Sequence, residues 1–100
     1  MFTFKEANEF TTEILSDRTL QNKGFQVLVG SSLKDPSIKL EDITDNTPCK
    51  WFVVIIKEPG NRSAESKRGD IMPKGAYRID SENLDDIRTW FEQKKKELLT

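Results

Sequence analysis

The most apolar stretch of the chain, Trp51-Phe52-Val53-Val54-Ile55-Ile56, constrains the fold more than any other feature. Large apolar side chains fill both alternating sets of positions in it, whereas a strand with one face in water alternates cleanly between apolar and polar residues. The run therefore predicts a central β-strand that is covered on both faces for part of its length. It is far shorter than the roughly 20 residues that a membrane helix needs.

Weaker signals predict further strands on either side of this run. Residues 25–29 are rich in β-branched side chains, and Gly30-Ser31-Ser32 after them indicates the end of that strand. Residues 37–41 alternate apolar and polar and predict a short, half-exposed strand after Pro36. Residues 75–79 predict another strand. The sheet should therefore contain three or four strands.

Two helices are expected at the ends of the chain. Thr3 and Glu6 have the spacing of a capping box, and the apolar residues that follow recur at helical spacing to about residue 16. A continuation of this helix to Asn22 stays open, because a C-terminal stop signal follows there at Gly24. Asp80-Ser81 should cap a second helix, whose acids lie at its start and whose lysines lie at its end, as the helix dipole favours.

The length of 100 residues fits a single domain spanning 1–100. We expect the α+β class: a small antiparallel sheet of three or four strands, with the N- and C-terminal helices packed on one face. The expected element order is α-β-β-β-β-α. Short connections favour this meander over a topology with crossovers.

A long polar segment, residues 58–75, separates the central strand from the strand after it. A hairpin needs only about 2–5 residues to turn, and loops beyond about 12–15 residues without structure of their own are often functional. The composition of the segment fits a solvated insertion that the fold tolerates. Its mixed charge, Gly hinges and apolar Ile71-Met72 pair also suit a flexible loop that orders on a protein partner. The candidate contact residues in it are Arg62, Lys67, Arg68 and Met72.

The residues needed for common catalytic chemistry are scarce. The chain has no histidine, so it contains no Ser-His or Cys-His couple, and its single cysteine, Cys49, cannot form an internal disulfide. Cys49 borders an apolar run and should be a buried core residue. We therefore expect no cofactor, no metal site and a non-catalytic role. A carboxylate-based enzyme ranks lowest and would need a cleft that unites two or more of Glu41, Asp42, Asp45 and Asp70.

The leading hypothesis is a small cytoplasmic binding module that contacts another protein, such as an adaptor, an inhibitor or a mobile-element accessory protein. The N-terminus does not resemble a signal peptide, and a lone cysteine fits a reducing compartment. Sixteen basic and 17 acidic residues give a net charge of −1, so no long-range field draws the chain to a membrane. The contact surface should be the long loop with the exposed face of the sheet, in a monomer or a weak dimer.

Nucleic-acid binding is the alternative. The basic residues available for it are those of the loop and of the C-terminal helix: Arg62, Lys67, Arg68, Lys74, Lys94, Lys95 and Lys96. The order of a helix, strands and a helix also resembles that of double-stranded-RNA-binding domains, which place lysines at the start of the last helix. Here the matching residues 80–86 read DSENLDD, which would repel phosphates.

The two tryptophans are a separate marker. Trp51 and Trp90 each lie at the margin of an apolar set, and we expect both to be buried in so thin a core. Tryptophan is enriched at interaction hot spots. Whichever of the two is exposed becomes the first candidate for a binding patch.

Overall fold

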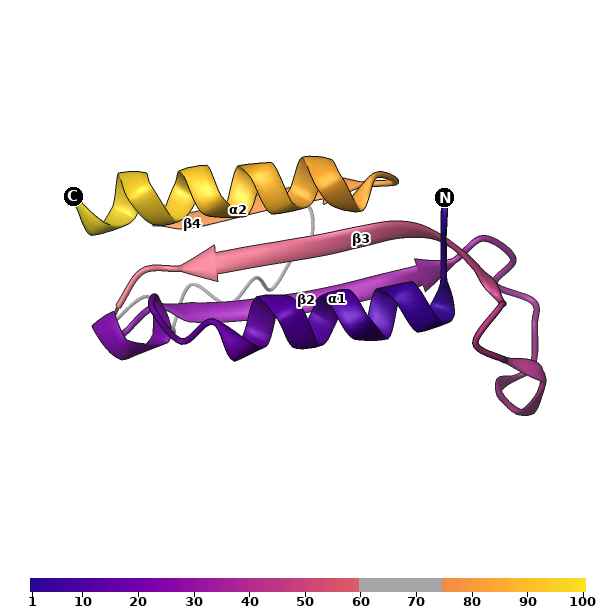
Figure 1. Ribbon diagram of the computed structural model, residues 1–100. Helices are drawn as coiled ribbons and strands as arrows, with labels where there is room; N and C mark the ends of the chain where they lie inside the picture. Colours follow the sequence, from indigo (N-terminus) through magenta and orange to yellow (C-terminus); the bar gives the residue numbers. More distant parts are fainter. Residues whose placement is uncertain (60–74) are drawn as a thin grey trace.

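The computed structural model describes residues 1–59 and 75–100 and confirms the α+β class. Figure 1 shows two helices lying over one face of an antiparallel sheet. The helices and strands are β1 (Phe2–Thr3), α1 (Phe4–Ser16), β2 (Gln26–Leu33), β3 (Pro48–Lys57), β4 (Ala76–Ser81) and α2 (Leu84–Leu99). Two single 3-10 turns, η1 (Gln21–Lys23) and η2 (Leu40–Asp42), lie in the connections.

Strand β3 is the central strand, as the apolar run predicts. On one side it pairs with β2 from Gln26↔Lys57 to Leu33↔Cys49. On its other side it pairs with β1 at its start and with β4 along the rest of its length. All three pairings are antiparallel. The connection between β3 and β4 contains residues 60–74, which lie outside the described residues.

Helix α1 starts with the predicted capping box. The Thr3 hydroxyl accepts a hydrogen bond from the Glu6 amide at 3.1 Å, and the Glu6 carboxylate accepts one from the Thr3 amide at 2.9 Å. The helix ends at Ser16, so the continuation to Asn22 is wrong. Asp17 follows as the C-cap, and its carboxylate accepts hydrogen bonds from the amide and the hydroxyl of Thr19, two residues later. Gly24, at φ +93°, closes the turn that follows.

Strand β2 runs through Gly30-Ser31-Ser32, where the sequence indicated its end. These three residues pair with Val53, Phe52 and Trp51 of β3. Small turn-forming residues do not stop a strand whose backbone groups find partners on a long neighbour. The predicted end of this strand is therefore wrong.

The strand expected at residues 37–41 is absent from the structure. The Asp35 carboxylate accepts hydrogen bonds from the Ser37 amide and hydroxyl, which makes a local turn, and η2 follows. The fourth strand of the sheet is instead the two-residue β1. Alternation over five residues predicts a strand only where a neighbouring strand can accept it.

Helix α2 begins later than its predicted cap. Strand β4 extends to Ser81, which pairs with Phe52, so Asp80 and Ser81 belong to the sheet. The N-cap is Asn83, whose side chain accepts the Asp85 amide hydrogen at 2.9 Å. The predicted charge order of the helix, with acids first and lysines last, is unchanged.

The core lies between the helices and the sheet. It combines side chains from both helices and from the helix-facing side of β3. Its fully buried members include Leu20, Cys49, Phe52, Val54, Ile56 and Ile87. No helix in residues 1–59 or 75–100 has the length and apolar character needed to cross a bilayer.

Candidate binding face

The face of the sheet opposite the helices carries the most exposed tryptophan of the chain. Because side chains alternate along a strand, Phe52, Val54 and Ile56 point to the core while their neighbours point away. We call this second side the open face. Its members are Gln26, Leu28, Gly30 and Ser32 of β2, Trp51, Val53, Ile55 and Lys57 of β3, and Ala76, Arg78 and Asp80 of β4.

A β-bulge at Lys50 brings Cys49 into the core, although Trp51 beside it points away from the core. The pairing with β2 steps from Ser32↔Trp51 to Leu33↔Cys49, so Lys50 is the extra residue. Such an insertion shifts the alternation by one position. Cys49 and Phe52 can therefore both lie in the core, fully buried, while Trp51 between them is 43% exposed. The expectation that Trp51 is buried is wrong, and Trp90 is half-buried.

Apolar surface on the open face concentrates on β2 and β3. Leu28 is 38% exposed, and Val53 and Ile55 are half-buried. Between Leu28 and Ser32 lies Gly30, and a methyl group built there would just touch Val53 at 3.4 Å. The lack of a side chain at Gly30 leaves Val53 uncovered from that side. Lys50, whose Nζ lies 5.9 Å from the centre of the Trp51 ring, adds one positive charge beside this patch.

The β4 side of the open face is charged. Arg78 and Asp80 form an ion pair at 3.4 Å, and they lie opposite Ile55 and Val53. Lys57, at the end of β3, is buried. The open face is thus apolar from Trp51 to Leu28 and polar toward β4.

The predicted loop residues cannot be placed on this face. Arg62, Lys67, Arg68, Met72 and Lys74 all belong to residues 60–74, outside the described part of the chain. Both ends of the predicted 58–75 segment are described. The Glu58 amide donates to the Gly75 carbonyl at 2.8 Å, and the Tyr77 hydroxyl donates to the Glu58 carboxylate at 2.6 Å. These bonds hold the two ends together, and the second raises the pKa of Tyr77.

Two of the three C-terminal lysines have acidic or aromatic neighbours. Lys94 lies 5.0 Å from the centre of the Tyr77 ring and pairs with Glu97 at 3.5 Å. Lys95 pairs with Asp17 and Glu92, and its side chain is only 14% exposed. Lys96 is exposed. Lys94 and Lys95 therefore make contacts within the protein itself.

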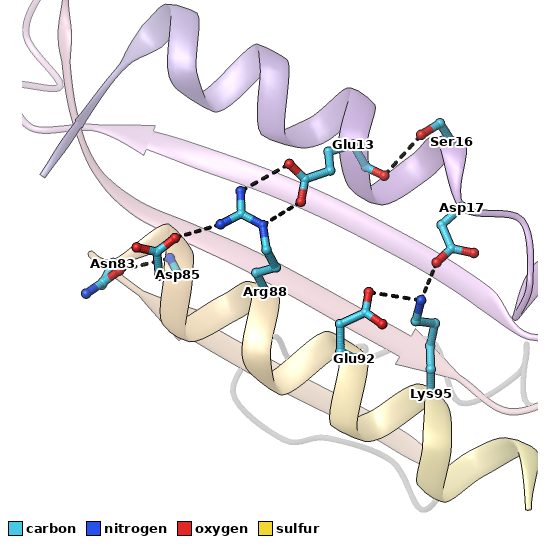
Figure 2. A network of polar contacts seen from close by, with 8 residues as sticks. All are labelled: Glu13, Ser16, Asp17, Asn83, Asp85, Arg88, Glu92 and Lys95. Atoms are coloured by element: carbon cyan, nitrogen blue, oxygen red, sulfur yellow. Dashed lines mark hydrogen bonds and ion pairs between the residues drawn. The ribbon is translucent and has the colours of Figure 1, made fainter.

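Helices α1 and α2 run parallel and are joined by the polar network in Figure 2. The Arg88 guanidinium donates two hydrogen bonds to Glu13, at 2.7 and 3.1 Å, and one to Asp85 at 2.6 Å. These bonds lower the pKa of Glu13 and raise that of Arg88. About two turns further along α2, Lys95 bridges Asp17 and Glu92. No sequence signal could connect these groups, because Glu13 and Arg88 are 75 residues apart.

An open cavity of about 460 Å³ lies where both helices begin. Its lining is mostly polar and acidic: Met1, Phe2, Glu6, Glu82, Asn83, Leu84, Asp85 and Arg88. Because the helices are parallel, both positive N-terminal ends meet there, and carboxylates stabilise such ends. This explains the acids without a ligand. No group of three or more Cys, Asp or Glu side chains within residues 1–59 and 75–100 could hold a metal ion.

The Asp17–Lys95 contact predicts a pH-dependent stability. Hydrogen bonds from Lys95 and Thr19 lower the pKa of Asp17 from 3.8 to about 2. A lowered folded-state pKa stabilises the fold above the unfolded-state pKa, and the contribution disappears as the pH falls through the folded-state value. Asp17→Asn should therefore cost about 1–2 kcal/mol at pH 7 and only a minor part of that at pH 2, where about half of the folded-state carboxylates are protonated. Urea unfolding of both proteins between pH 2 and 7 measures the difference.

Lys95→Met provides the matched control for this prediction, because it removes the ammonium group and keeps an apolar stem of similar length. In that background the cost of Asp17→Asn at pH 7 should shrink by about half or more, since the two residues act as a pair. A cost that is the same at pH 2 and pH 7 would contradict the assignment.

The single cysteine of the chain lies in the core. Cys49 is fully buried, as predicted, and burial raises the pKa of its thiol.

Comparisons with protein-family models, with curated proteins and with solved structures find no match for this chain.

Proposed function

We propose that this chain is a non-catalytic binding module that contacts another protein through the open face of its sheet. The observation that carries the proposal is the exposure of Trp51 and Leu28 on the side of the sheet that the helices leave uncovered. Adaptors, inhibitors and mobile-element accessory proteins are the classes that such a module fits. A cytoplasmic setting suits its unpaired, buried thiol.

The energetics of burial favour Trp51 as the anchor of this contact. Covering apolar surface yields about 25 cal/mol per Å², and tryptophan is among the residues most often found at hot spots. A hot spot is effective when surrounding contacts exclude water from it. Leu28, Val53 and Ile55 supply such surroundings, and the Lys50 ammonium favours a partner with an acidic group at the rim.

The chemistry of the chain supports binding over turnover. The sequence has no histidine, and the thiol of Cys49 is enclosed in the core. Of the four acids considered for a carboxylate enzyme, Glu41, Asp42 and Asp45 are exposed in the connection between β2 and β3. The fourth, Asp70, lies outside the described residues. Glu41, Asp42 and Asp45 belong to turns, and none of them lines the cavity where both helices begin.

The predicted loop contacts remain part of the proposal. The connection between β3 and β4 follows Lys57 and precedes Ala76, the last pair of the two strands on the open face. In the sequence, this connection contains Arg62, Lys67, Arg68 and Met72. A partner on the open face could therefore contact this connection as well.

Nucleic-acid binding is the less favoured alternative. Lys95 is paired with two carboxylates, and Lys94 with one. The start of α2 is acidic, with Asp85 and Asp86 in its first turn, where a phosphate backbone would be repelled. Binding driven by phosphate contacts weakens steeply as salt rises, so the salt dependence of any complex distinguishes the two functions.

The test compares two exposed apolar side chains that differ in position. A tagged wild-type chain captures its partner from a native lysate, and the affinity of the identified partner is then measured for each variant. Trp51→Ala should weaken binding by at least about 30-fold, the effect of losing a hot spot. Leu40→Ala is the control, because Leu40 is 84% exposed in η2, away from the open face. Equal affinities for wild type and Trp51→Ala would refute the proposal.

A further inference from the structure

The outer edge of β2 is an unusual edge strand. Within the described residues, β2 pairs with β3 alone, so one row of its backbone amide and carbonyl groups has no strand beside it. Proteins commonly protect such edges with charged side chains or proline. Residues Gln26–Leu33 contain neither, although a third of the whole chain is charged. The edge strand on the other side of the sheet, β4, carries Arg78 and Asp80.

The side of α1 above this edge is also uncharged. Glu13 and Asp17 mark the side of α1 that faces α2, since they pair with Arg88 and Lys95 there. The opposite side carries, at helical spacing, Phe4, Asn8, Thr11 and Leu15. Phe4 and Leu15 are only partly buried, as are Val29 and Leu33 on the helix-facing side of β2. Helix and strand together make one continuous surface without charge.

We propose that this surface binds a second copy of the same chain, with β2 pairing antiparallel to its own copy about a two-fold axis at Gly30. The two sheets would then form one continuous antiparallel sheet. With the axis at a residue, each core-facing residue of β2 pairs with a core-facing residue of the other copy. The helices of both copies therefore lie on the same side of the joined sheet. The open face of one copy would continue into the open face of the other, and the two α1 helices would lie side by side.

The sequence of β2 is complementary to itself in this pairing. Its first half, QVLV, is large and mostly apolar, and its second half, GSSL, starts with three small residues. Pairing about Gly30 places Leu28 opposite Ser32 of the other copy and Val29 opposite Ser31. Large side chains therefore meet small ones at each of these positions. A surface without charge also needs no opposite charge in its partner, which favours a copy of itself over an acidic or basic strand.

The spacing of the helices fits this arrangement. Helix α1 packs on both β2 and β3. Because neighbouring strands are about 4.8 Å apart, two strand spacings would separate α1 from its copy, about 10 Å. Packed helices lie about 8–10 Å apart. The uncharged sides of the two α1 helices would thus come into direct contact when the strands pair.

The mass of the purified chain in solution tests the dimer, because no other protein is needed. Sedimentation or light scattering over a concentration series should show a dimer of 100-residue chains. Ser31→Lys places a charge at the exposed centre of the edge, and Asn8→Glu places one on the exposed side of α1. Each should raise the dimer dissociation constant by at least about tenfold, since charges on an edge oppose pairing.

Thr89→Lys is the matched control, because Thr89 is exposed on α2, on the other helix. It should leave the dissociation constant unchanged, and circular dichroism should show that all three variants are folded. A wild-type chain that stays monomeric over the series, or a dimer that both edge variants leave intact, overturns the proposal. Protection of the β2 amides from hydrogen exchange only in complex with a different protein also overturns it, because the edge would then serve that partner. The proposed binding through Trp51 is measured separately and does not depend on these results.

Discussion

Phe52→Ala should lower the free energy of unfolding by about 3–5 kcal/mol, the usual cost of emptying a fully buried phenylalanine site. Phe52 is completely buried at the middle of the central strand. Its ring packs edge-on against Phe10, with ring centres 4.9 Å apart, and against Phe2 at 6.3 Å. A domain of this size has a total stability of about 5–15 kcal/mol. The variant should therefore be close to unfolded at 37 °C, as urea or thermal unfolding followed by circular dichroism would show.

The next residue along the chain is the control for this prediction. Trp51 has a larger side chain, but it lies on the open face and is 43% exposed. Trp51→Ala should cost about 1 kcal/mol or less, since exposed positions tolerate truncation. If Phe52→Ala does not fold, Phe52→Leu extends the measurement, with an expected cost of about 1–2 kcal/mol. Similar costs for Trp51→Ala and Phe52→Ala would contradict the placement of the two side chains.

Leu20→Ala should cost about 2–4 kcal/mol, although Leu20 lies in an irregular connection. The residue follows the end of α1 and is completely buried. Its carbonyl accepts hydrogen bonds from the Lys23 and Phe25 amides, at 3.0 and 3.1 Å, so the backbone around it is held in place. A fixed backbone cannot collapse to fill the cavity left by the side chain. Equilibrium unfolding in urea measures the loss.

The chain offers the same substitution at an exposed site. Leu40 is 84% exposed in η2, and Leu40→Ala should change the free energy of unfolding by no more than about 0.5 kcal/mol. Comparing the two variants separates the effect of burial from any effect of losing a leucine in the unfolded chain. A loss at Leu20 as small as that at Leu40 would show that Leu20 is not part of the core.

Local sequence signals predicted the elements that local physics can form. The Thr3–Glu6 capping box and the spacing of the apolar residues define α1, and both act over a few residues. The run at 51–56 predicted the central strand because both of its alternating sets are apolar, and a short run rich in Val and Ile is typical of a strand covered on both faces. Gly24 likewise has a positive φ in the structure, a conformation that glycine adopts easily because it lacks a Cβ atom.

Where the local signals failed, contacts between residues distant in the sequence decided the structure. Gly30-Ser31-Ser32 continues β2 because β3 supplies partners, whereas residues 37–41 alternate without one. The burial of Cys49 together with Phe52 depends on the bulge at Lys50, which exists only as a relation between two strands. The candidate face was expected as a surface of the sheet, but Leu28 could be assigned to it only from the register. The loop residues proposed with it stay a prediction.

By itself, the sequence determined the α+β class, the central strand, the start of α1 and the lack of imidazole chemistry. Each of these depends on the identity of residues or on interactions over one or two turns of chain. The tertiary structure alone decided the burial of Leu20, the pairing of Glu13 with Arg88 and the exposure of Trp51 beside a fully buried Phe52. These features depend on which segments become neighbours, and a period of apolar residues does not contain that information.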